Sequence, residues 1–257
     1  MKKAIFITVR TGSTRLPEKA LLKINERSTI ELVIDRVKRS KKAQIIVLCT
    51  TESKNDDILC EIAKKKGIMF FRGSAEDKLM RWKGAAEKYD VEFFVTSDGD
   101  DLLCDPELID LAFAQYERCG ADFIECKNVP CGGFTYGIKV SALNKVCEIK
   151  DSAETEMMWV YFTDTGLFKT EILQDVPIAL QRPEIRMTLD YEDDLRFFKV
   201  IFDHFADNPT FTLRDVVKFL DENPDVIKIN QHLQEKFLAN QKSRTKLVLK
   251  KEVKNNE

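Results

Sequence analysis

Short apolar runs alternate with amphipathic segments along the first half of the chain. The apolar, β-branched runs predict strands, and segments with apolar residues every three or four positions predict helices. Strands are predicted at 3–9, 43–50, 68–71, 92–97 and 121–126, and helices at 28–40, 55–66, 76–89 and 106–120. Strands separated by helices indicate an α/β fold with a doubly wound, mainly parallel sheet.

Local signals mark several of the predicted helix ends. Ser28 is a suitable cap for the first helix, and Gly67 follows the second. Pro106 and Gly120 stand at the start and after the end of the fourth, the positions where these residues are favoured.

The segment 127–185 has a less regular pattern, with one helix expected at 141–149. It concentrates large apolar side chains, namely Phe134, Tyr136, Met157, Met158, Trp159, Tyr161 and Phe162. Exposed on a monomer they would form an unusual patch, which predicts a homodimer contact in this insertion. A local core under a loop is the alternative.

Regular patterns return after this insertion. A strand is predicted at 186–189, followed by helices over 190–205 and from residue 212 to a stop at Pro224. Residues 1–235 are expected to form one domain because no Gly/Pro/Ser-rich linker divides them. Residues 236–257 form a basic tail, interpreted as a solvated helix or as a segment with an anionic partner.

Composition narrows the class of protein. The chain has 257 residues, of which 33% are charged, and a net charge of −2, so no global basic field indicates nucleic acid. No apolar run approaches the roughly 20 residues of a membrane helix. The seven cysteines contain no CxxC pair and only two histidines are present, which argues against structural zinc and favours reduced thiols in a cytoplasmic protein.

A basic loop, "VRTGSTRLPEK" at 9–19, follows the first predicted strand. It carries three cations and two hydroxyl donors: Arg10, Arg15, Lys19, Ser13 and Thr14. Gly12 leaves room for a phosphate to approach the backbone amides, and Arg grips phosphate bidentately. The loop is neither a Walker A sequence nor a GxGxxG motif. It predicts a site for a polyphosphate, with an ordinary basic surface turn as the alternative.

An acidic loop, "SDGDD", follows another predicted strand and contains Asp98, Asp100 and Asp101. Asp190 directly follows a further predicted strand. The carboxyl ends of parallel strands meet at one edge of a sheet, and Mg²⁺ prefers carboxylate oxygens. Asp100 and Asp190 are therefore candidates to hold one Mg²⁺ between them. For Asp190, capping of the following helix is the other interpretation.

Several motifs together resemble a known family. "RTGSTRLPEKAL" is similar to the N-terminal signature of the cytidylyltransferases that make CMP-activated sugars, such as the 3-deoxy-manno-octulosonate and acylneuraminate enzymes. "FRGSAEDKLMRW" (71–82), "DPELID" (105–110) and "LDYEDDL" (189–195) resemble the spore coat polysaccharide biosynthesis protein F branch, as does "FLDENPDVIKIN". The resemblance covers residues 3–125 and 185–232.

The resemblance implies a GT-A-like nucleotidyltransferase fold, usually dimeric, that moves CMP from CTP to an acceptor with release of pyrophosphate. The residues implied for the triphosphate are Arg10, Thr11, Gly12, Ser13, Thr14, Arg15 and Lys19, of which Arg10, Arg15 and Lys19 are the catalytic candidates. Gly73, Ser74, Asp77 and Arg81 match the stretch near the cytosine and ribose. Asp100 and Asp190 match the Mg²⁺ ligands.

The chain departs from the family pattern at three places. Glu18 replaces a common glycine, and Asp101 and Leu102 replace Cys and Pro. Asp98 stands where a neutral residue is common, so it is a candidate to bind hydroxyls or an ammonium group of the acceptor, or to orient water on the metal. The cations proposed for an anionic acceptor are Lys127, Lys139, Arg182 and Arg186.

A sugar acid is the first choice of acceptor, and a small amino-bearing phosphate or phosphonate the second. Two other functions stay open from the sequence. Asp98-Gly99-Asp100 is itself the DxD pattern of a GT-A glycosyltransferase, although those enzymes do not carry the basic loop. A nucleotide-sensing or scaffold protein would keep the fold without catalysis.

Overall fold

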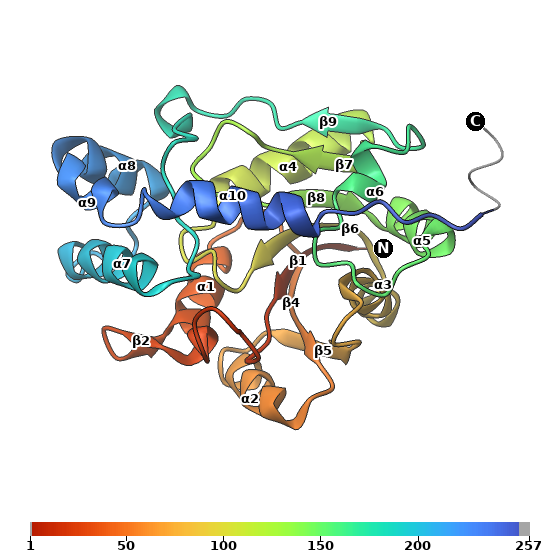
Figure 1. Cartoon of the computed structure of the whole chain (residues 1–257), viewed down its shortest axis with the longest axis horizontal. Coiled ribbons are helices and arrows are strands. Elements are labelled where there is room, and N and C mark those ends of the chain that lie inside the picture. Colours follow the sequence, from red (N-terminus) through yellow and green to blue (C-terminus); the bar gives the residue numbers. More distant parts are fainter. Residues whose placement is uncertain (1, 252–257) are drawn as a thin grey trace.

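The structure is a computed structural model that describes residues 2–251, so the end of the predicted basic tail, including Lys254, lies outside the described residues. A seven-stranded sheet forms its centre, in the order β5-β4-β1-β6-β8-β7-β9 (Figure 1). The strands are β1 (Lys2–Thr8), β4 (Ile45–Thr51), β5 (Met69–Gly73), β6 (Val91–Asp98), β7 (Phe123–Glu125), β8 (Tyr136–Lys139) and β9 (Thr170–Ile172). A small hairpin, β2 (Lys23–Ile24) and β3 (Arg27–Ser28), stands apart from it.

The first half of the sheet is parallel, as predicted. β1 pairs in parallel with β4 and β6, and β4 with β5. The segment 127–185 contributes β8, which runs antiparallel between β6 and β7, and β9 at the edge. The predicted doubly wound, mainly parallel sheet is confirmed, and the less regular segment is part of it.

Helices cover both faces of the sheet. They are α1 (Thr29–Val37), α2 (Asp57–Lys65), α3 (Lys78–Tyr89), α4 (Pro106–Cys119), α5 (Val140–Ile149), α6 (Val160–Thr163), α7 (Glu192–His204), α8 (Leu213–Glu222), α9 (Pro224–Lys228) and α10 (Leu233–Arg244). Successive side chains of a strand point to opposite faces. Ile5 and Ile7 of β1 accordingly join the core under α1, α2 and α4, and Ala4 and Phe6 join the core under α3, α5 and α6.

The predicted helix ends are confirmed where the local signal was strong. Ser28 caps α1 through a capping box with Glu31. Pro106 opens α4, and Gly120 ends it with a φ of 62°. Between residues 2 and 251, the structure has no helix long and apolar enough to cross a membrane.

The strand predicted at 186–189 is wrong, because only Arg186 forms a bridge, to Cys131. The backbone of this segment bonds to two different partners: the Met187 amide donates to Cys131 O at 2.8 Å, and the Leu189 amide to Asp100 O at 2.9 Å. A Cβ on Gly132 would lie 2.1 Å from Met187 O, so the close approach requires glycine. These contacts bring the following residue, Asp190, to the acidic loop.

Four of the seven large apolar residues of the insertion are buried within the chain, and Tyr136, Met157 and Trp159 are half-buried. Phe134, Met158, Tyr161 and Phe162 are each at most 6% exposed, and the ring of Phe162 stacks on Phe123 with centroids 4.9 Å apart. The alternative of a local core is therefore confirmed for these four side chains, and they form no exposed patch. The homodimer stays a prediction, but an exposed apolar patch formed by these four side chains no longer supports it.

Candidate active site

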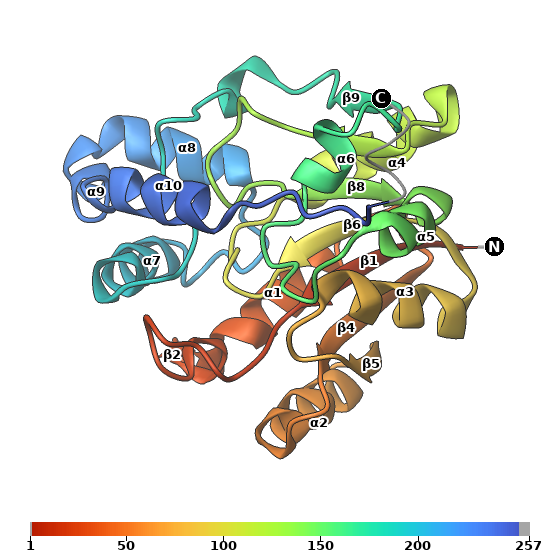
Figure 2. The same cartoon turned by 45° about the vertical axis from the view of Figure 1, so that its right-hand side comes forward.

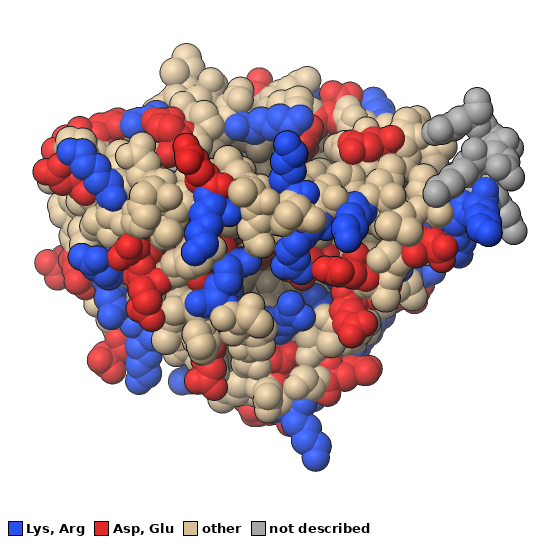
Figure 3. All heavy atoms as spheres, in the orientation of Figure 1, with Lys and Arg blue, Asp and Glu red and all other residues tan. Residues whose placement is uncertain are grey.

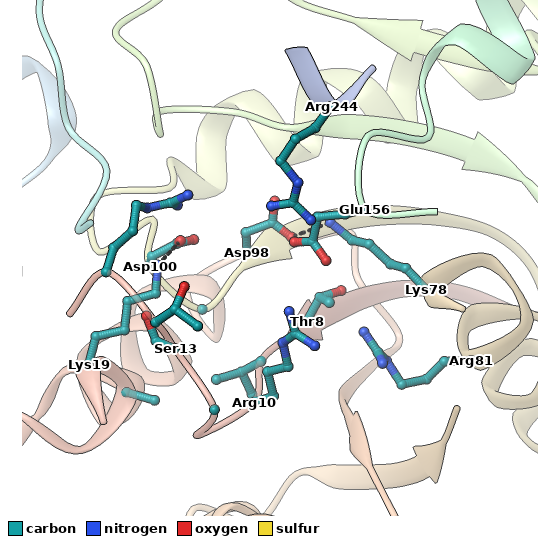
Figure 4. A pocket seen from close by; sticks show the side chains of 16 residues that line it. Thr8, Arg10, Ser13, Lys19, Lys78, Arg81, Asp98, Asp100, Glu156 and Arg244 are labelled. Carbon is teal, nitrogen blue, oxygen red and sulfur yellow. Dashed lines mark hydrogen bonds and ion pairs between the residues drawn. The ribbon is translucent and has the colours of Figure 1, made fainter. Parts of the chain in front are cut away.

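A charged pocket of about 150 Å³ lies at the carboxyl ends of β1 and β6. Figure 3 shows Lys and Arg side chains gathered around a hollow near the middle of this face. The residues that line it are Thr8, Val9, Arg10, Gly12, Ser13, Thr14, Arg15, Lys19, Ala20, Lys78, Arg81, Asp98, Gly99, Asp100, Glu156 and Arg244 (Figure 4). The pocket therefore brings together most of the basic loop and the acidic loop predicted from the sequence.

The pairing of β1 with β6 positions these two loops. Thr8 lies opposite Asp98 in the parallel register, and the Gly99 amide donates to Thr8 O at 2.8 Å. A Cβ on Gly99 would meet the Val9 side chain at 2.7 Å, so glycine is needed where the loops approach. Two loops of opposite charge thus leave the sheet side by side.

Lys19 connects the basic loop to the acidic loop and to Asp190. Its Nζ donates to Asp100 Oδ2 at 2.5 Å and to Asp190 Oδ1 at 2.8 Å, and Arg15 also donates to Asp190 Oδ1. The Lys19 and Asp190 side chains are only 16% and 1% exposed. The predicted catalytic lysine and the two predicted metal ligands therefore meet at one point.

Burial and charge set the ionisation of this group. Burial alone would lower the pKa of Lys19, but Asp100 and Asp190 outweigh it and raise that pKa above its ordinary value. Burial alone would raise the pKa of Asp190, yet Lys19 and Arg15 hold it below its usual range. Lys19 is therefore a cation and Asp190 an anion at neutral pH.

The donor set fits a hard divalent cation such as Mg²⁺. Asp100 Oδ2 and Asp190 Oδ1 converge on Lys19 Nζ. Asp190 Oδ2 is buried and makes no hydrogen bond, although it lies 3.5 Å from Arg186 Nη2. Asp98, Asp100 and Asp101 also offer oxygens within 4.8 Å of one another. Burial, followed by the Asp100 and Asp98 charges, raises the pKa of Asp101 well above its ordinary value. Asp100 belongs to this cluster and also converges with Asp190, and the pair Asp100 and Asp190 stays the predicted set of metal ligands.

A second charged group forms the opposite wall of the pocket (Figure 4). Lys78 Nζ donates to Asp98 Oδ1 at 3.1 Å, with the Lys78 side chain 8% exposed. Burial raises the pKa of Asp98, although Lys78 opposes this effect. The pKa of Glu156 lies below its usual range, mainly because of the Lys78 charge. Burial opposes this effect, and the charges of Arg10 and Arg244 add to it.

The sequence interpretation missed three residues of this wall: Lys78, Glu156 and Arg244. Lys78 had a usable signal, because it lies three positions before Arg81 and side chains at that spacing share one helix face. Glu156 and Arg244 come from the irregular segment and from the tail, where no motif marks them.

Four of the predicted nucleotide residues lie outside the pocket lining. Thr11 donates its amide and its hydroxyl to Asp56, at 2.8 and 2.7 Å, and so fixes the basic loop to the start of α2. Asp77 caps α3 and accepts hydrogen bonds from Lys150 Nζ at 2.5 Å and Thr155 Oγ1 at 3.0 Å.

Of the other two, Gly73 is the last residue of β5 and Ser74 follows it, where Ser74 O accepts from Arg81 Nη1 at 2.5 Å. Contacts between these four residues and a nucleotide stay predictions. The structure shows their part in the frame: they tie the strand ends to α2, α3 and the segment that carries Glu156.

The cations predicted for an anionic acceptor do not line the pocket. Lys127 pairs with Glu125, Lys139 with Asp122, Arg182 with Glu184 and Asp221, and Arg186 with Asp194. None of the four lines the pocket, whereas Lys78 and Arg244 do, so the predicted set of acceptor cations does not match the cations of the pocket wall.

Glu18 shows why a glycine is common at its position in related sequences. Its φ is 50°, in the left-handed region where glycine is favoured. The backbone of the basic loop therefore keeps a glycine-like conformation although a carboxylate side chain is present.

The fold and the pocket define a nucleotidyltransferase: a basic loop after the first strand faces an acidic loop at the carboxyl edge of a mainly parallel sheet. The chain belongs to the cytidylyltransferase family, whose model matches residues 4–242. It is accordingly a CTP-dependent enzyme. The resemblance inferred from the motifs is confirmed.

Individual relatives cover most of the chain. An uncharacterised protein of Methanocaldococcus jannaschii is 33% identical over 238 residues, which are 92% of this chain and 97% of the relative. The spore coat polysaccharide biosynthesis protein SpsF of Bacillus subtilis is 26% identical over 226 residues, 85% of this chain and 94% of the relative. The structure of a cytidylyltransferase from Leptospira borgpetersenii superposes with a TM-score of 0.80 at 30% identity, over 88% of this chain and 97% of that one.

Proposed function

We propose that the protein transfers CMP from CTP to a sugar acid, with release of pyrophosphate, for the synthesis of a surface polysaccharide. The observation that carries the proposal is the convergence of Lys19, Asp100 and Asp190 beneath the basic loop. The similarity to SpsF supports the polysaccharide role. The seven free thiols suit a cytoplasmic location.

The basic loop would hold the triphosphate. Arg10 and Arg15 supply guanidinium groups for phosphate oxygens, and Ser13 and Thr14 add hydroxyl donors at the pocket wall. An acceptor hydroxyl oxygen attacks the α-phosphorus in line, the bond from the α-phosphorus to the oxygen that bridges to the β-phosphate breaks, and pyrophosphate leaves with that electron pair. The acceptor hydroxyl releases its proton to solvent. Lys19, buried and charged, is placed to neutralise the charge that develops on pyrophosphate.

Asp100 and Asp190 would hold Mg²⁺, which neutralises phosphate charge when it is bound. Lys19 bonds to the same two carboxylates and so fixes their orientation before a nucleotide enters. Burial opposes ionisation of Asp190, but the charges of Lys19 and Arg15 hold its pKa below its usual range, so its carboxylate is ionised.

The wall formed by Lys78, Asp98 and Glu156 would face the acceptor. Asp98 is not a free carboxylate, because it already accepts from Lys78. An acceptor hydroxyl or ammonium group that bonds to Asp98 would share it with Lys78. A small amino-bearing phosphate or phosphonate therefore stays the second choice of acceptor after a sugar acid.

The first prediction concerns the nucleotide and the metal. Thermal shifts with CTP, UTP, ATP and GTP should show the largest stabilisation by CTP, because only ligands that bind the folded state raise its melting temperature. Pyrophosphate release with a panel of 2-keto sugar acids should require CTP and Mg²⁺ together. A preference for a purine nucleotide, or release of a nucleoside diphosphate from a nucleotide sugar, would contradict the proposal and favour the glycosyltransferase alternative.

The second prediction is a homodimer. The dimer was inferred from the family resemblance, which implies that an inserted segment forms the contact between the two subunits. Light scattering at micromolar concentration should give about twice the mass of the 29.7 kDa chain. A monomer mass at all concentrations tested would contradict the dimer without affecting the proposed reaction.

A further inference from the structure

The last described part of the chain runs along the pocket. α10 begins beside α9, and the residues that follow it reach α5 on the other side of the molecule (Figure 1 and Figure 2). We call residues 233–251 the strap. The strap carries Arg244 into the pocket lining, where the guanidinium points toward Asp98 and Glu156 (Figure 4).

The strap is anchored on both sides of Arg244. Near its start, the Arg186 guanidinium lies 4.6 Å from the centroid of the Phe237 ring. Near its end, Val248 O accepts a hydrogen bond from the Asp151 amide at 2.8 Å. The backbone of Arg244 is therefore held in place from two directions, and the position of its side chain beside the pocket does not depend on one contact.

Arg244 joins the pocket at the wall that the proposed function assigns to the acceptor. It lines the pocket together with Lys78, Asp98 and Glu156, and its guanidinium lies on their side of the pocket (Figure 4). Lys19 and Asp100, which the proposed function assigns to the triphosphate and Mg²⁺, lie at the other side. The position of Arg244 therefore suits contact with the acceptor.

The present partners of Arg244 indicate what kind of group it would bind. Its Nη2 lies 3.3 Å from Glu154 Oε1, and the two side chains are 36% and 72% exposed. Such an exposed pair contributes little stability and is easily exchanged. A second carboxylate, Glu156, lies where the charges of Lys78, Arg10 and Arg244 all favour its ionised form. Carboxylates of the chain itself thus surround Arg244, and a guanidinium matches a carboxylate bidentately.

We propose that the strap supplies an acceptor-binding residue: Arg244 binds the carboxylate of the sugar acid and exchanges Glu154 for it. This proposal rests on the proposed function and adds to it a residue that no sequence motif marks. Lys78, on the facing wall, stays bound to Asp98 and leaves Arg244 as the cation free to change partner.

The test measures acceptor binding apart from chemistry. Calorimetric titrations use the full chain, saturated with Mg²⁺ and an α,β-methylene analogue of CTP, which cannot be cleaved. The probes are N-acetylneuraminate and 3-deoxy-manno-octulosonate, each compared with its uncharged methyl ester. Arg244→Ala should weaken binding of the preferred acid about 10- to 100-fold, the effect of losing one hydrogen bond to a charged group. Its affinity for the CTP analogue should stay within about twofold of the wild type.

Two further proteins make the result specific. Lys242→Ala removes an exposed cation from the same helix end without touching the pocket, and both affinities should be unchanged. Arg244→Lys keeps the charge but not the bidentate fork, so an intermediate loss is expected.

Three results would be informative about which proposal fails. If the wild type binds neither acid better than its ester, or if Arg244→Ala leaves acid binding unchanged, the role of Arg244 is rejected. If Arg244→Ala weakens the CTP analogue instead, Arg244 contacts the nucleotide and the role proposed for it is also rejected. If the wild type does not bind the CTP analogue at all, the proposed function itself fails. The titration with the analogue thus tests the proposed function separately from the role of Arg244.

Discussion

Replacing Lys19 by alanine is expected to lower the turnover number by about 10²- to 10³-fold, the usual effect of removing one group that stabilises transition-state charge. Lys19 is the point at which the basic loop, the acidic loop and Asp190 meet. Its ammonium is kept charged by two carboxylates, so it is ready to neutralise the leaving pyrophosphate. Pyrophosphate release at saturating CTP measures the effect.

The same substitution leaves Asp100 and Asp190 without their shared cation, so loss of folding must be separated from loss of chemistry. Lys19→Met, which keeps most of the side-chain volume, and melting temperatures of both variants serve this purpose. Lys23→Ala is the matched control, because Lys23 is 68% exposed and pairs only weakly with Glu26. Wild-type turnover in a folded Lys19→Ala protein would exclude Lys19 from the catalytic machinery.

The fold was predictable where side-chain pattern and turn chemistry agree. β1, β4 and β6 are apolar runs bounded by polar loops, and Ser28, Pro106 and Gly120 mark helix ends by local backbone chemistry. β8 was not predicted, because a four-residue strand with Gly137 in it carries no clear period. Gly137 is there for packing: a Cβ would lie 2.7 Å from the Phe93 ring.

The site was predictable where its residues follow strands. Arg10, Asp98 and Asp100 lie just after β1 or at the end of β6, and parallel neighbours place such residues together. Lys19 lies further along the basic loop and was marked by its charge within that motif. Asp190 was chosen for the wrong reason, since the segment before it is not a strand. Its position comes from hydrogen bonds of that segment to Asp100 and Cys131, which no sequence pattern records.

Arg244 and the four misplaced acceptor cations show the limit of reasoning from charge alone. Lys127, Lys139, Arg182 and Arg186 were chosen by their position in the sequence, yet none of them lines the pocket. The path of the strap across the molecule depends on contacts between residues far apart in the chain. Only the folded structure brings a residue of the tail to the pocket.

The largest expected loss of stability comes from Asp194→Ala. The Asp194 carboxylate is fully buried and accepts from Arg186 Nε at 2.8 Å and Nη2 at 2.9 Å. It also accepts from Asn230 Nδ2 and from the amides of Asp190 and Tyr191. Removing it leaves the buried Arg186 charge without its main partner, which should cost about 3–5 kcal/mol in the free energy of unfolding. The urea midpoint, at an unchanged slope, measures this loss.

Asp193→Ala is the matched control, because Asp193 is the neighbouring acid and pairs with Arg196 on the surface. It should change the free energy of unfolding by less than about 1 kcal/mol. Replacing the whole pair, as Arg186→Met with Asp194→Leu, should recover much of the stability, because no buried charge is then left alone. Activity should not recover with it, since the Asp190 amide still lacks the carboxylate that holds it in place. If the double variant regains both stability and activity, the buried Arg186–Asp194 pair supports only the fold. Asp190 would then keep its position beside Lys19 without that pair.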